Sequence, residues 1–189
     1  MKTLKTIFLA ALLALPGVTF AGAPWTFVDL GYLAADSGDE RTDGVSLRGS
    51  IGFAGMWHAG AGYLTADVAG GKSKPGGADV DGYNIYVGLH PAVTDSTDLV
   101  LDLGYEALEA DGGGGSTIDT TDVFLRAGPR ALLAGDKLEL SAYLILAFGE
   151  DEFTSSVTED FTDIRYQVGG QYYFNEAWSV GADANIAGS

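Results

Sequence analysis

The chain contains no cysteine, only two histidines and only five prolines among its 189 residues. The missing thiols exclude a disulfide framework and a thiolate metal site. Because histidine is so scarce, neither a serine triad nor a zinc motif can be assembled, and we predict no enzyme activity, catalytic residue, metal or cofactor. No apolar run reaches the roughly 20 residues of a membrane-spanning helix, so a membrane role can come only from strands.

Basic residues are also scarce, because 10 Lys and Arg stand against 26 Asp and Glu, which gives a net charge of −16 at pH 7. Such acidity repels phosphates and therefore argues against nucleic-acid binding. It favours a surface that attracts cations.

The amino-terminal residues have the pattern of a cleavable export signal. Two lysines precede an uncharged apolar run from Ile7 to Leu15, which is about half the roughly 20 residues of a spanning helix. We expect cleavage after Ala21, because a cut two residues later would place Pro24 next to the scissile bond. Residues 1–21 are therefore predicted to be a signal peptide, and residues 22–189 a single exported domain.

Most of the exported domain alternates between apolar and polar residues with a period of two, which is typical of a strand with two different faces. Between Leu99 and Glu106, for example, leucines and a tyrosine alternate with valine, aspartate, glycine and glutamate. Nine such segments can be traced, each near the 9–11 residues of a tilted membrane strand. They are Trp25–Ala34, Gly44–Phe53, Trp57–Ala66, Gly82–His90, Asp98–Leu108, Asp122–Leu132, Leu138–Gly149, Thr162–Phe174 and Trp178–Ala187.

The connections alternate between long acidic loops and short links. The long loops are Asp36–Asp43, Asp67–Asp81, Glu109–Thr121 and Glu150–Phe161, and the short links include residues 54–56, 134–136 and 175–177. Long loops on one side and short turns on the other are typical of outer-membrane barrels, whose termini lie in the periplasm. We therefore predict an all-β, antiparallel up-and-down transmembrane β-barrel.

Alternation alone also fits a soluble lipocalin-like barrel with an apolar interior. However, the apolar face carries several large side chains per strand, too many for the interior of a small barrel. The opposite face is rich in glycine. We therefore expect the leucine and tyrosine face to contact lipid, and the glycines and charged residues to line the lumen.

Aromatic residues gather at the strand ends, as in the two interfacial girdles of membrane barrels. The predicted girdle comprises Tyr32, Tyr63, Tyr83 and Tyr105 near the outer ends, and Phe53, Trp57, Phe174 and Trp178 near the periplasmic ends. The last four belong to two hairpins, in each of which we expect the phenylalanine and the tryptophan to meet across the ladder.

The polar face carries charges of both signs. The predicted lumen network comprises Asp29, Arg48, Asp102, Glu106, Arg126, Arg130, Glu139, Arg165 and Asp183. Hairpin symmetry places Asp102 opposite Arg126 and Arg130 close to Glu139. Two functions fit this face. A structural or interaction role with a salt-bridged, largely filled lumen is favoured because mixed charges pair, and a narrow porin-like channel is the alternative.

Two clusters of acidic loop residues offer oxygen ligands that suit divalent cations. They are Asp36, Asp39, Glu40 and Asp43, and Glu150, Asp151, Glu152, Glu159 and Asp160. A solvated surface is the simpler reading, so we expect at most weak cation binding that bridges to lipopolysaccharide phosphates. The other expected partners are outer-membrane lipid, lipopolysaccharide and, during biogenesis, the barrel-assembly machinery.

Two further features have structural readings. The glycine run Asp111–Ser116 lacks the Lys-Ser/Thr ending of a phosphate loop and the spacing of a calcium repeat, so we expect a loop tip. His58 and His90 both fall at periplasmic strand ends, where His90 is expected near Asp98. Because neither histidine would meet an extracellular substrate, an outer-membrane enzyme is a distant alternative.

Several short motifs carry a resemblance to a known family: Phe27-Val28-Asp29-Leu30-Gly31-Tyr32, Asp43–Ser50, Ala61-Gly62-Tyr63 and Thr97–Val100. The chain resembles small outer-membrane barrel proteins of plant-pathogenic and related proteobacteria that were once described as a secreted quorum-sensing factor. More loosely, it is similar to general outer-membrane β-barrel domain proteins.

The resemblance implies a ten-stranded barrel in the outer membrane or vesicles of a Gram-negative cell, a link to signalling, and no catalytic residue to transfer. The last strand in that family ends in an aromatic residue that the assembly machinery reads, whereas this sequence ends in Ala187-Gly188-Ser189. Because bacterial barrels favour even strand numbers, we expect ten strands in the complete barrel. Either the last strand is missing here, or the first and ninth strands close imperfectly.

Overall fold

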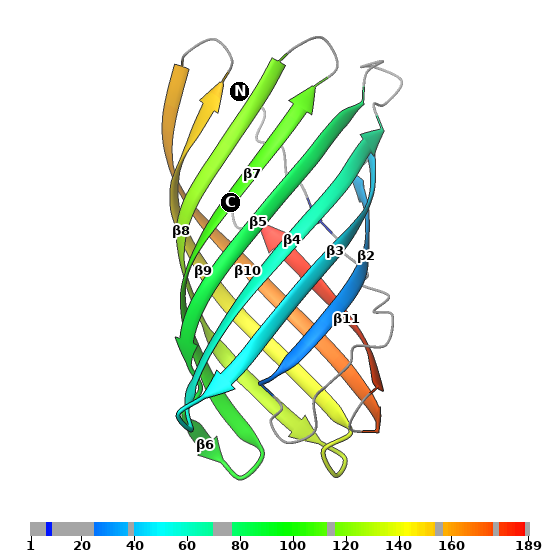
Figure 1. Ribbon diagram of the computed structural model, residues 1–189, viewed down its shortest axis with the longest axis vertical. Helices are drawn as coiled ribbons and strands as arrows, with labels where there is room; N and C mark the ends of the chain where they lie inside the picture. The colour runs from blue at the N-terminus through cyan, green and yellow to red at the C-terminus, as the bar shows by residue number, and fades with distance from the viewer. Residues whose placement is uncertain are drawn as a thin grey trace.

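The chain folds into a single antiparallel sheet that contains nine long strands (Figure 1). The computed structural model describes residues 7–8, 25–37, 40–69, 77–112, 116–153, 157–175 and 178–187. The predicted all-β, antiparallel up-and-down architecture is confirmed, because each of the nine alternating segments lies within or overlaps one long strand. Across these described ranges, no helix has the length and apolarity needed to cross a membrane.

The strands follow the chain in order around the sheet. The order is β1-β11-β10-β9-β8-β7-β5-β4-β3-β2, and β6 pairs with β7. The bounds are β1 (Ile7–Phe8), β2 (Phe27–Ser37), β3 (Glu40–Phe53), β4 (Trp57–Ala69), β5 (Ala78–Leu89), β6 (Ala92–Thr94), β7 (Thr97–Gly112), β8 (Ser116–Leu133), β9 (Leu138–Phe153), β10 (Val157–Asn175) and β11 (Trp178–Ala187).

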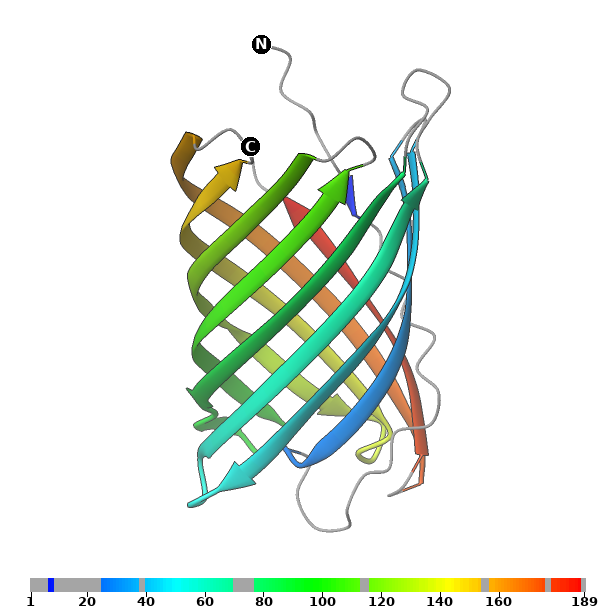
Figure 2. The ribbon, with the colours of Figure 1, turned by 45° about the horizontal axis from the view of Figure 1, so that its top comes forward.

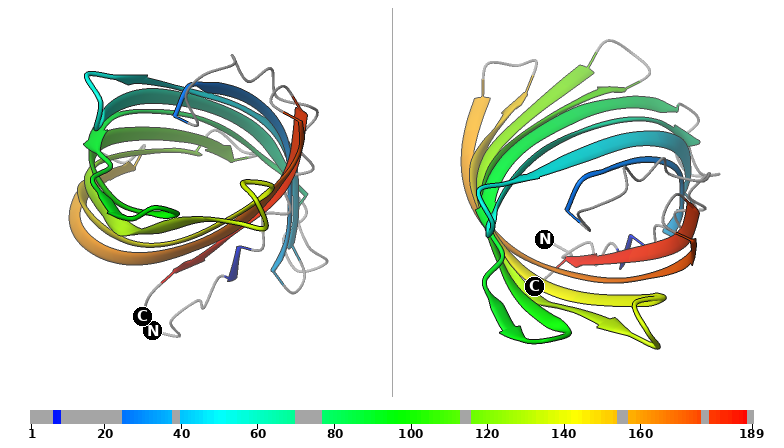
Figure 3. Two further views of the ribbon diagram at one scale, coloured as in Figure 1. Left: turned by 90° about the horizontal axis from the view of Figure 1, so that it is seen from below. Right: turned by 60° about the horizontal axis from the view of Figure 1, so that its bottom comes forward.

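The sheet curls around a central lumen, as Figures 2 and 3 show. Strands β2 and β11 lie at the two sides of what we call the seam, and no pairing between them is found in the described part of the chain. At one end of the seam β1 pairs with β11 through Ile7 opposite Ile186 and Phe8 opposite Asn185. The predicted cleavage position at Ala21 lies outside the described residues.

The hairpins β2–β3, β4–β5, β7–β8 and β9–β10 all lie at the same end of the barrel, called here the long-hairpin end. The opposite, short-turn end carries the turns at residues 54–56 and 134–136, as predicted. Ala54 and Gly55 have φ values of 47° and 79°, and Ala134 and Gly135 have 54° and 68°. These left-handed conformations suit tight hairpins, because they match the twist of the flanking strands.

Three of the four predicted long acidic loops are wrong, because most of their residues belong to paired strands. Of the fourth, Asp67–Asp81, residues 70–76 lie outside the described residues. Pairing continues to Ser37 opposite Glu40 in β2–β3, to Gly112 opposite Ser116 in β7–β8, and to Phe153 opposite Val157 in β9–β10. The apolar alternation stops earlier than the backbone ladder does. A ladder needs only N–H and C=O groups, so it persists where both strand faces are polar.

Side-chain burial is inverted relative to a water-soluble protein, in which large apolar residues are inside. Ile85 and Leu103 point away from the lumen and are 56 % and 52 % exposed. By contrast, Asp102 is 4 % exposed and faces the lumen. The large apolar side chains on one face of each strand therefore form the outer surface.

Glycines on the lumenal face make room for the large side chains of the neighbouring strand. A Cβ atom at Gly60 would collide with the Tyr86 ring, and one at Gly104 would collide with the Phe124 ring. The glycine-rich face is therefore the face on which bulky groups cross a narrow lumen.

Candidate functional site: the ion-paired lumen

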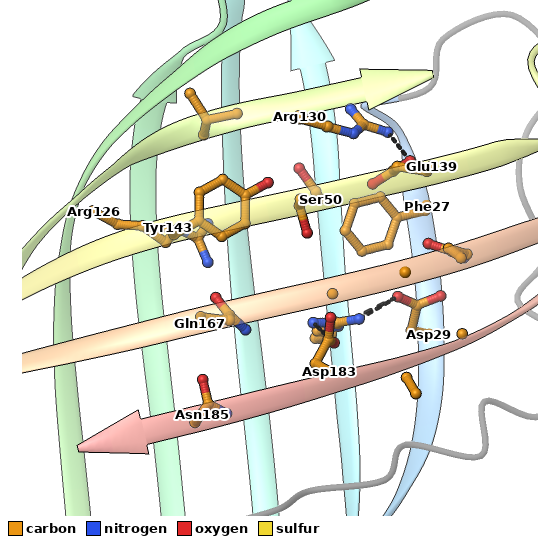
Figure 4. Close-up of a pocket in the computed structure, with 18 of the residues that line it drawn as sticks. Phe27, Asp29, Ser50, Arg126, Arg130, Glu139, Tyr143, Gln167, Asp183 and Asn185 are labelled. Atoms are coloured by element: carbon orange, nitrogen blue, oxygen red, sulfur yellow. Dashed lines mark hydrogen bonds and ion pairs between the residues drawn. The ribbon is translucent and has the colours of Figure 1, made fainter. Parts of the chain in front are cut away.

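A cavity of about 1070 Å³ occupies the lumen (Figure 4). Trp25 and Lys137 line it at the short-turn end, and Val68 and Val80 line it at the long-hairpin end. The lumen is therefore less filled than the sequence led us to expect.

The nine residues of the predicted network all lie on the lumenal face, and the structure brings them into ion pairs. The two pairs expected from hairpin symmetry are present, because Arg126 lies 2.6 Å from Asp102 and Arg130 lies 2.6 Å from Glu139. The other pairs are Arg48–Asp29 at 3.2 Å, Arg48–Asp183 at 3.0 Å and Arg165–Glu106 at 2.7 Å.

Arg126 is fixed from several sides. Its guanidinium carbon lies 5.0 Å from the centre of the Tyr86 ring and 5.2 Å from the centre of the Tyr143 ring. Its partner Asp102 also lies 2.7 Å from Nε2 of His58. A cation over an aromatic face stabilises the folded state by about 0.5–2 kcal/mol. These contacts therefore fix the position of the Arg126 side chain in the lumen.

Trp25 lies inside the short-turn end and was not predicted there. Its ring, which is 8 % exposed, stacks on His90 at a centroid distance of 4.0 Å and on His58 at 4.6 Å. The Arg130 guanidinium lies over the same ring at 4.1 Å. Both histidines of the chain therefore pack against one tryptophan, and we call these four residues the Trp25 cluster.

Alternation with a period of two places Trp25 on the same face as Asp29, so the sequence held a signal for its lumenal position that our prediction did not include. Strand β2 begins only at Phe27. The strand therefore begins two residues later than we predicted, and the Trp25 side chain lines the cavity together with Phe27 and Asp29.

The ion pairs of the described lumen join four arginines to seven carboxylates, which leaves a surplus of negative charge. The carboxylates absent from our prediction are Asp122, which lies 2.9 Å from Arg165, and Asp163, which lies 3.9 Å from it. Among the buried oxygens of the described residues, Asp29 Oδ1, Asp122 Oδ1 and Gln167 Oε1 have no hydrogen-bond partner. Buried hydrogen-bond acceptors without partners therefore lie in the wall of the lumen.

The predicted girdle residues at the long-hairpin end lie on the outer surface. Tyr32 donates a hydrogen bond to Asp43, and Tyr63 donates one to Asp81 at 2.7 Å. In both pairs the hydroxyl reaches past the residue opposite, towards the hairpin tips. The hydrogen bond from Tyr63 holds the pKa of the Asp81 carboxyl below its ordinary value, and a hydrogen bond from Thr65 contributes further. The rings of Tyr83 and Tyr105 lie 6.3 Å apart.

At the short-turn end, one of the two predicted aromatic pairs is present and the other is wrong. Phe53 lies directly opposite Trp57. Trp178 lies opposite Asn175 instead of Phe174, because the register shifts after Tyr173. The Phe174 ring packs against Tyr172 at 5.4 Å instead. A bulge of this kind displaces one residue and cannot be seen in the alternation.

The acidic clusters are only partly described. The side chains of Asp36 and Glu40 and all of Asp39 lie outside the described residues, as do residues 113–115 of the glycine run. Within the described ranges, no group of three or more His, Asp or Glu side chains is arranged to hold a metal ion.

Comparison with known proteins adds no family assignment. No protein-family model matches the chain, and no curated protein matches it either.

Proposed function

We propose that the chain is an outer-membrane β-barrel protein whose lumen is a narrow, cation-favouring passage with a constriction at the Trp25 cluster. The observation that carries the proposal is the inverted sheet. Its large apolar side chains point outward, while its charged side chains pair around a cavity of about 1070 Å³.

The outward face suits lipid. In water, exposed leucine and isoleucine along every strand would be unfavourable, at about 25 cal/mol for each Å² of apolar surface. In a bilayer the same surface contacts acyl chains. The tyrosine hydroxyls that reach Asp43 and Asp81 suit an interface, where an aromatic ring lies in the apolar layer and its polar tip reaches water.

A place in the outer membrane, which the family resemblance also implies, sets the orientation. Outer-membrane barrels extend further from the membrane outside the cell than in the periplasm, where they have short turns. At the long-hairpin end, the paired strands of β7–β8 and β9–β10 continue well beyond the tyrosine girdle. The long-hairpin end would therefore face outward, and the Trp25 cluster would lie at the periplasmic mouth.

The passage is supported by the cavity and the charge surplus. Residues from both ends of the barrel line one cavity. Seven carboxylates against four arginines make the potential inside negative, which attracts cations and repels anions.

A structural role without conduction is the second candidate, and the Trp25 cluster favours it. Four side chains from separate segments meet at one end of the lumen, with ring and guanidinium distances between 4.0 and 4.6 Å from Trp25. If these side chains close the lumen completely, the barrel is a silent scaffold.

Conductance in planar bilayers tests the proposal. We expect refolded protein to give small single-channel steps, and a KCl gradient to give a reversal potential that shows cation preference. Trp25→Ala tests the constriction. Trp57→Ala, which removes an outward tryptophan at the same short-turn end, is the control for effects of tryptophan loss on membrane insertion. Heat-modifiable gel migration shows whether each protein is folded. If neither the folded unaltered protein nor folded Trp25→Ala conducts current, the passage is rejected in favour of the structural role.

A further inference from the structure

An apolar surface lies inside the lumen near the long-hairpin end, where the polar alternation predicted none. Five aliphatic side chains form it, and all five line the cavity. They are Leu33 on β2, Leu64 and Val68 on β4, Val80 on β5 and Leu108 on β7, called here the lumenal apolar patch.

The patch is continuous across neighbouring strands. Leu64 lies opposite Gly82, and Gly82 lies opposite Leu108. The Leu108 side chain covers Gly82, because a Cβ atom there would collide with Leu108 Cδ2. The two leucines are therefore neighbours across a glycine, and Val80 lies opposite Ala66 in the next lumenal row.

Such a surface costs free energy when water covers it, at about 25 cal/mol for each Å². A purely aqueous cation passage gains nothing from it. A solute with an aliphatic part gains by covering it, because both apolar surfaces leave water together.

A negatively charged cluster adjoins the patch. Arg165 lies 2.7 Å from Glu106, 2.9 Å from Asp122 and 3.9 Å from Asp163. One guanidinium thus serves three carboxylates, which leaves two negative charges. Glu106 is two residues before Leu108 on the same face of β7, about 7 Å away along the strand.

Asp122 supplies an unused acceptor at this cluster. Its side chain is 3 % exposed, and Oδ2 binds Arg165 while Oδ1 has no hydrogen-bond partner. A buried carboxylate oxygen without a partner is unfavourable. Glu106 and Asp163 of the same cluster line the cavity, so a cationic group bound to them would also stabilise the nearby charge of Asp122.

We propose that the long-hairpin half of the lumen binds an amphiphilic cation, an alkylammonium compound. Its ammonium group lies at the Arg165 cluster and its aliphatic chain lies on the lumenal apolar patch. This inference rests on the proposed passage and names the solute class that the passage selects.

The two surfaces together exclude simpler solutes. Ammonium alone uses the carboxylates but leaves the aliphatic wall uncovered. An alkyl carboxylate covers the wall but is repelled by the surplus negative charge. Only a solute with both parts uses both surfaces, so affinity depends on charge and chain together.

Calorimetric titration of the refolded full chain in micelles tests the site with three probes: hexylammonium, hexanoate and ammonium. We expect hexylammonium to bind at least about tenfold more tightly than either of the others, which corresponds to about 1.4 kcal/mol. Equal binding of hexylammonium and hexanoate would overturn the proposal, because micelle partition alone gives that result.

Variants assign the binding to the two surfaces. Leu108→Asn and Asp122→Asn are each expected to weaken hexylammonium binding about fivefold or more, or about 1 kcal/mol. Leu132→Asn is the matched control, because Leu132 also lines the cavity but lies near the short-turn end. Unchanged affinity in both test variants would overturn the site. Val80→Thr replaces Leu108→Asn if that variant does not refold.

The experiments can reject the proposed passage and the proposed binding site independently of each other. Calorimetry reads binding whether or not the barrel conducts, so a silent barrel that binds hexylammonium keeps the site and loses the passage. In a conducting barrel, hexylammonium added on the long-hairpin side should block current at concentrations at which hexanoate does not. Conduction without selective block or binding would keep the passage and reject the site.

Discussion

Arg48 on β3 lies 3.0 Å from Asp183 on β11, and this ion pair joins the two sides of the seam from inside the lumen. The same guanidinium lies 3.2 Å from Asp29 on β2. One arginine therefore connects three strands at the place where the described backbone ladder is interrupted. Side-chain ion pairs therefore connect the two sides of the seam, whereas backbone hydrogen bonds connect the other strands of the sheet.

Arg48→Met should open this connection and leave Asp29 and Asp183 without their cation. Breaking a fully buried pair costs about 3–5 kcal/mol. Because the Arg48 side chain is 38 % exposed, we expect about 2 kcal/mol, measured as a lower urea midpoint in micelles. Arg48→Lys should retain part of the stability. A loss below about 0.5 kcal/mol in Arg48→Met would show that the seam does not depend on this residue.

If the proposed passage is narrowest at the Trp25 cluster, Trp25→Ala should enlarge the short-turn end of the lumen and raise single-channel conductance severalfold. The reason is that Trp25 is the residue on which His58, His90 and Arg130 converge. Trp25→Phe keeps a ring and should give an intermediate conductance. Equal conductance for Trp25→Ala and the unaltered protein would show that the narrowest point lies elsewhere.

Leu101→Arg should place a charge in the apolar layer, because Leu101 is 41 % exposed on the outward face of β7. An arginine facing lipid near the bilayer midplane costs about 2–4 kcal/mol. Gln167→Arg introduces the same side chain on the lumenal side, where carboxylates are in surplus, and should cost far less. Similar urea midpoints for the two variants would contradict the proposed orientation of the faces.

Gly88→Ala should disturb the contacts of Asp102. A Cβ atom there would collide with Asp102 Oδ1 and would lie 2.6 Å from the Leu101 carbonyl oxygen. Overpacking of this kind costs about 1–3 kcal/mol. Gly49→Ala is the matched control, because its Cβ would find its nearest neighbour at 3.4 Å. Unfolding midpoints should fall only in the first variant, and equal stability would show that Asp102 can move without cost.

Tyr63→Phe should raise the pKa of Asp81 towards its ordinary value of 3.8. Asp81 lies beyond the tyrosine girdle, and its pKa is lowered by the hydrogen bond that Tyr63 donates. The contribution of this bond is present at neutral pH and is lost as the pH falls through the lowered pKa. NMR titration of the Asp81 carboxyl measures the shift, and Tyr83→Phe serves as control. An unchanged pKa in Tyr63→Phe would assign the effect to Thr65.

The sequence predicted the features that depend on neighbouring strands. Alternation with a period of two decides which side chains share a face, so the outward leucines and the lumenal charges could be assigned before the structure. Hairpin symmetry also placed Asp102 against Arg126, because a register error of two residues keeps both side chains on the lumenal side.

Contacts across the lumen could not be predicted in this way. The pair of Arg165 on β10 with Glu106 on β7 depends on how tightly the sheet curls, and no local pattern encodes that curvature. The contacts of Trp25 with His58, His90 and Arg130 likewise depend on three other segments of the chain. The hairpin lengths were missed because hydropathy reports the environment of a strand and not its hydrogen bonds.

The extension of β7–β8 and β9–β10 beyond the tyrosine girdle has an electrostatic consequence for the mouth of the barrel. Between Tyr105 and Gly112, β7 continues for about 23 Å of chain, and its acidic residues are fixed on a stiff ladder. Salt at physiological strength screens charges over about 8 Å. The field of these paired, acidic strand ends therefore acts only on ions close to the opening. In the proposed passage it would raise the local concentration of cations at the entrance.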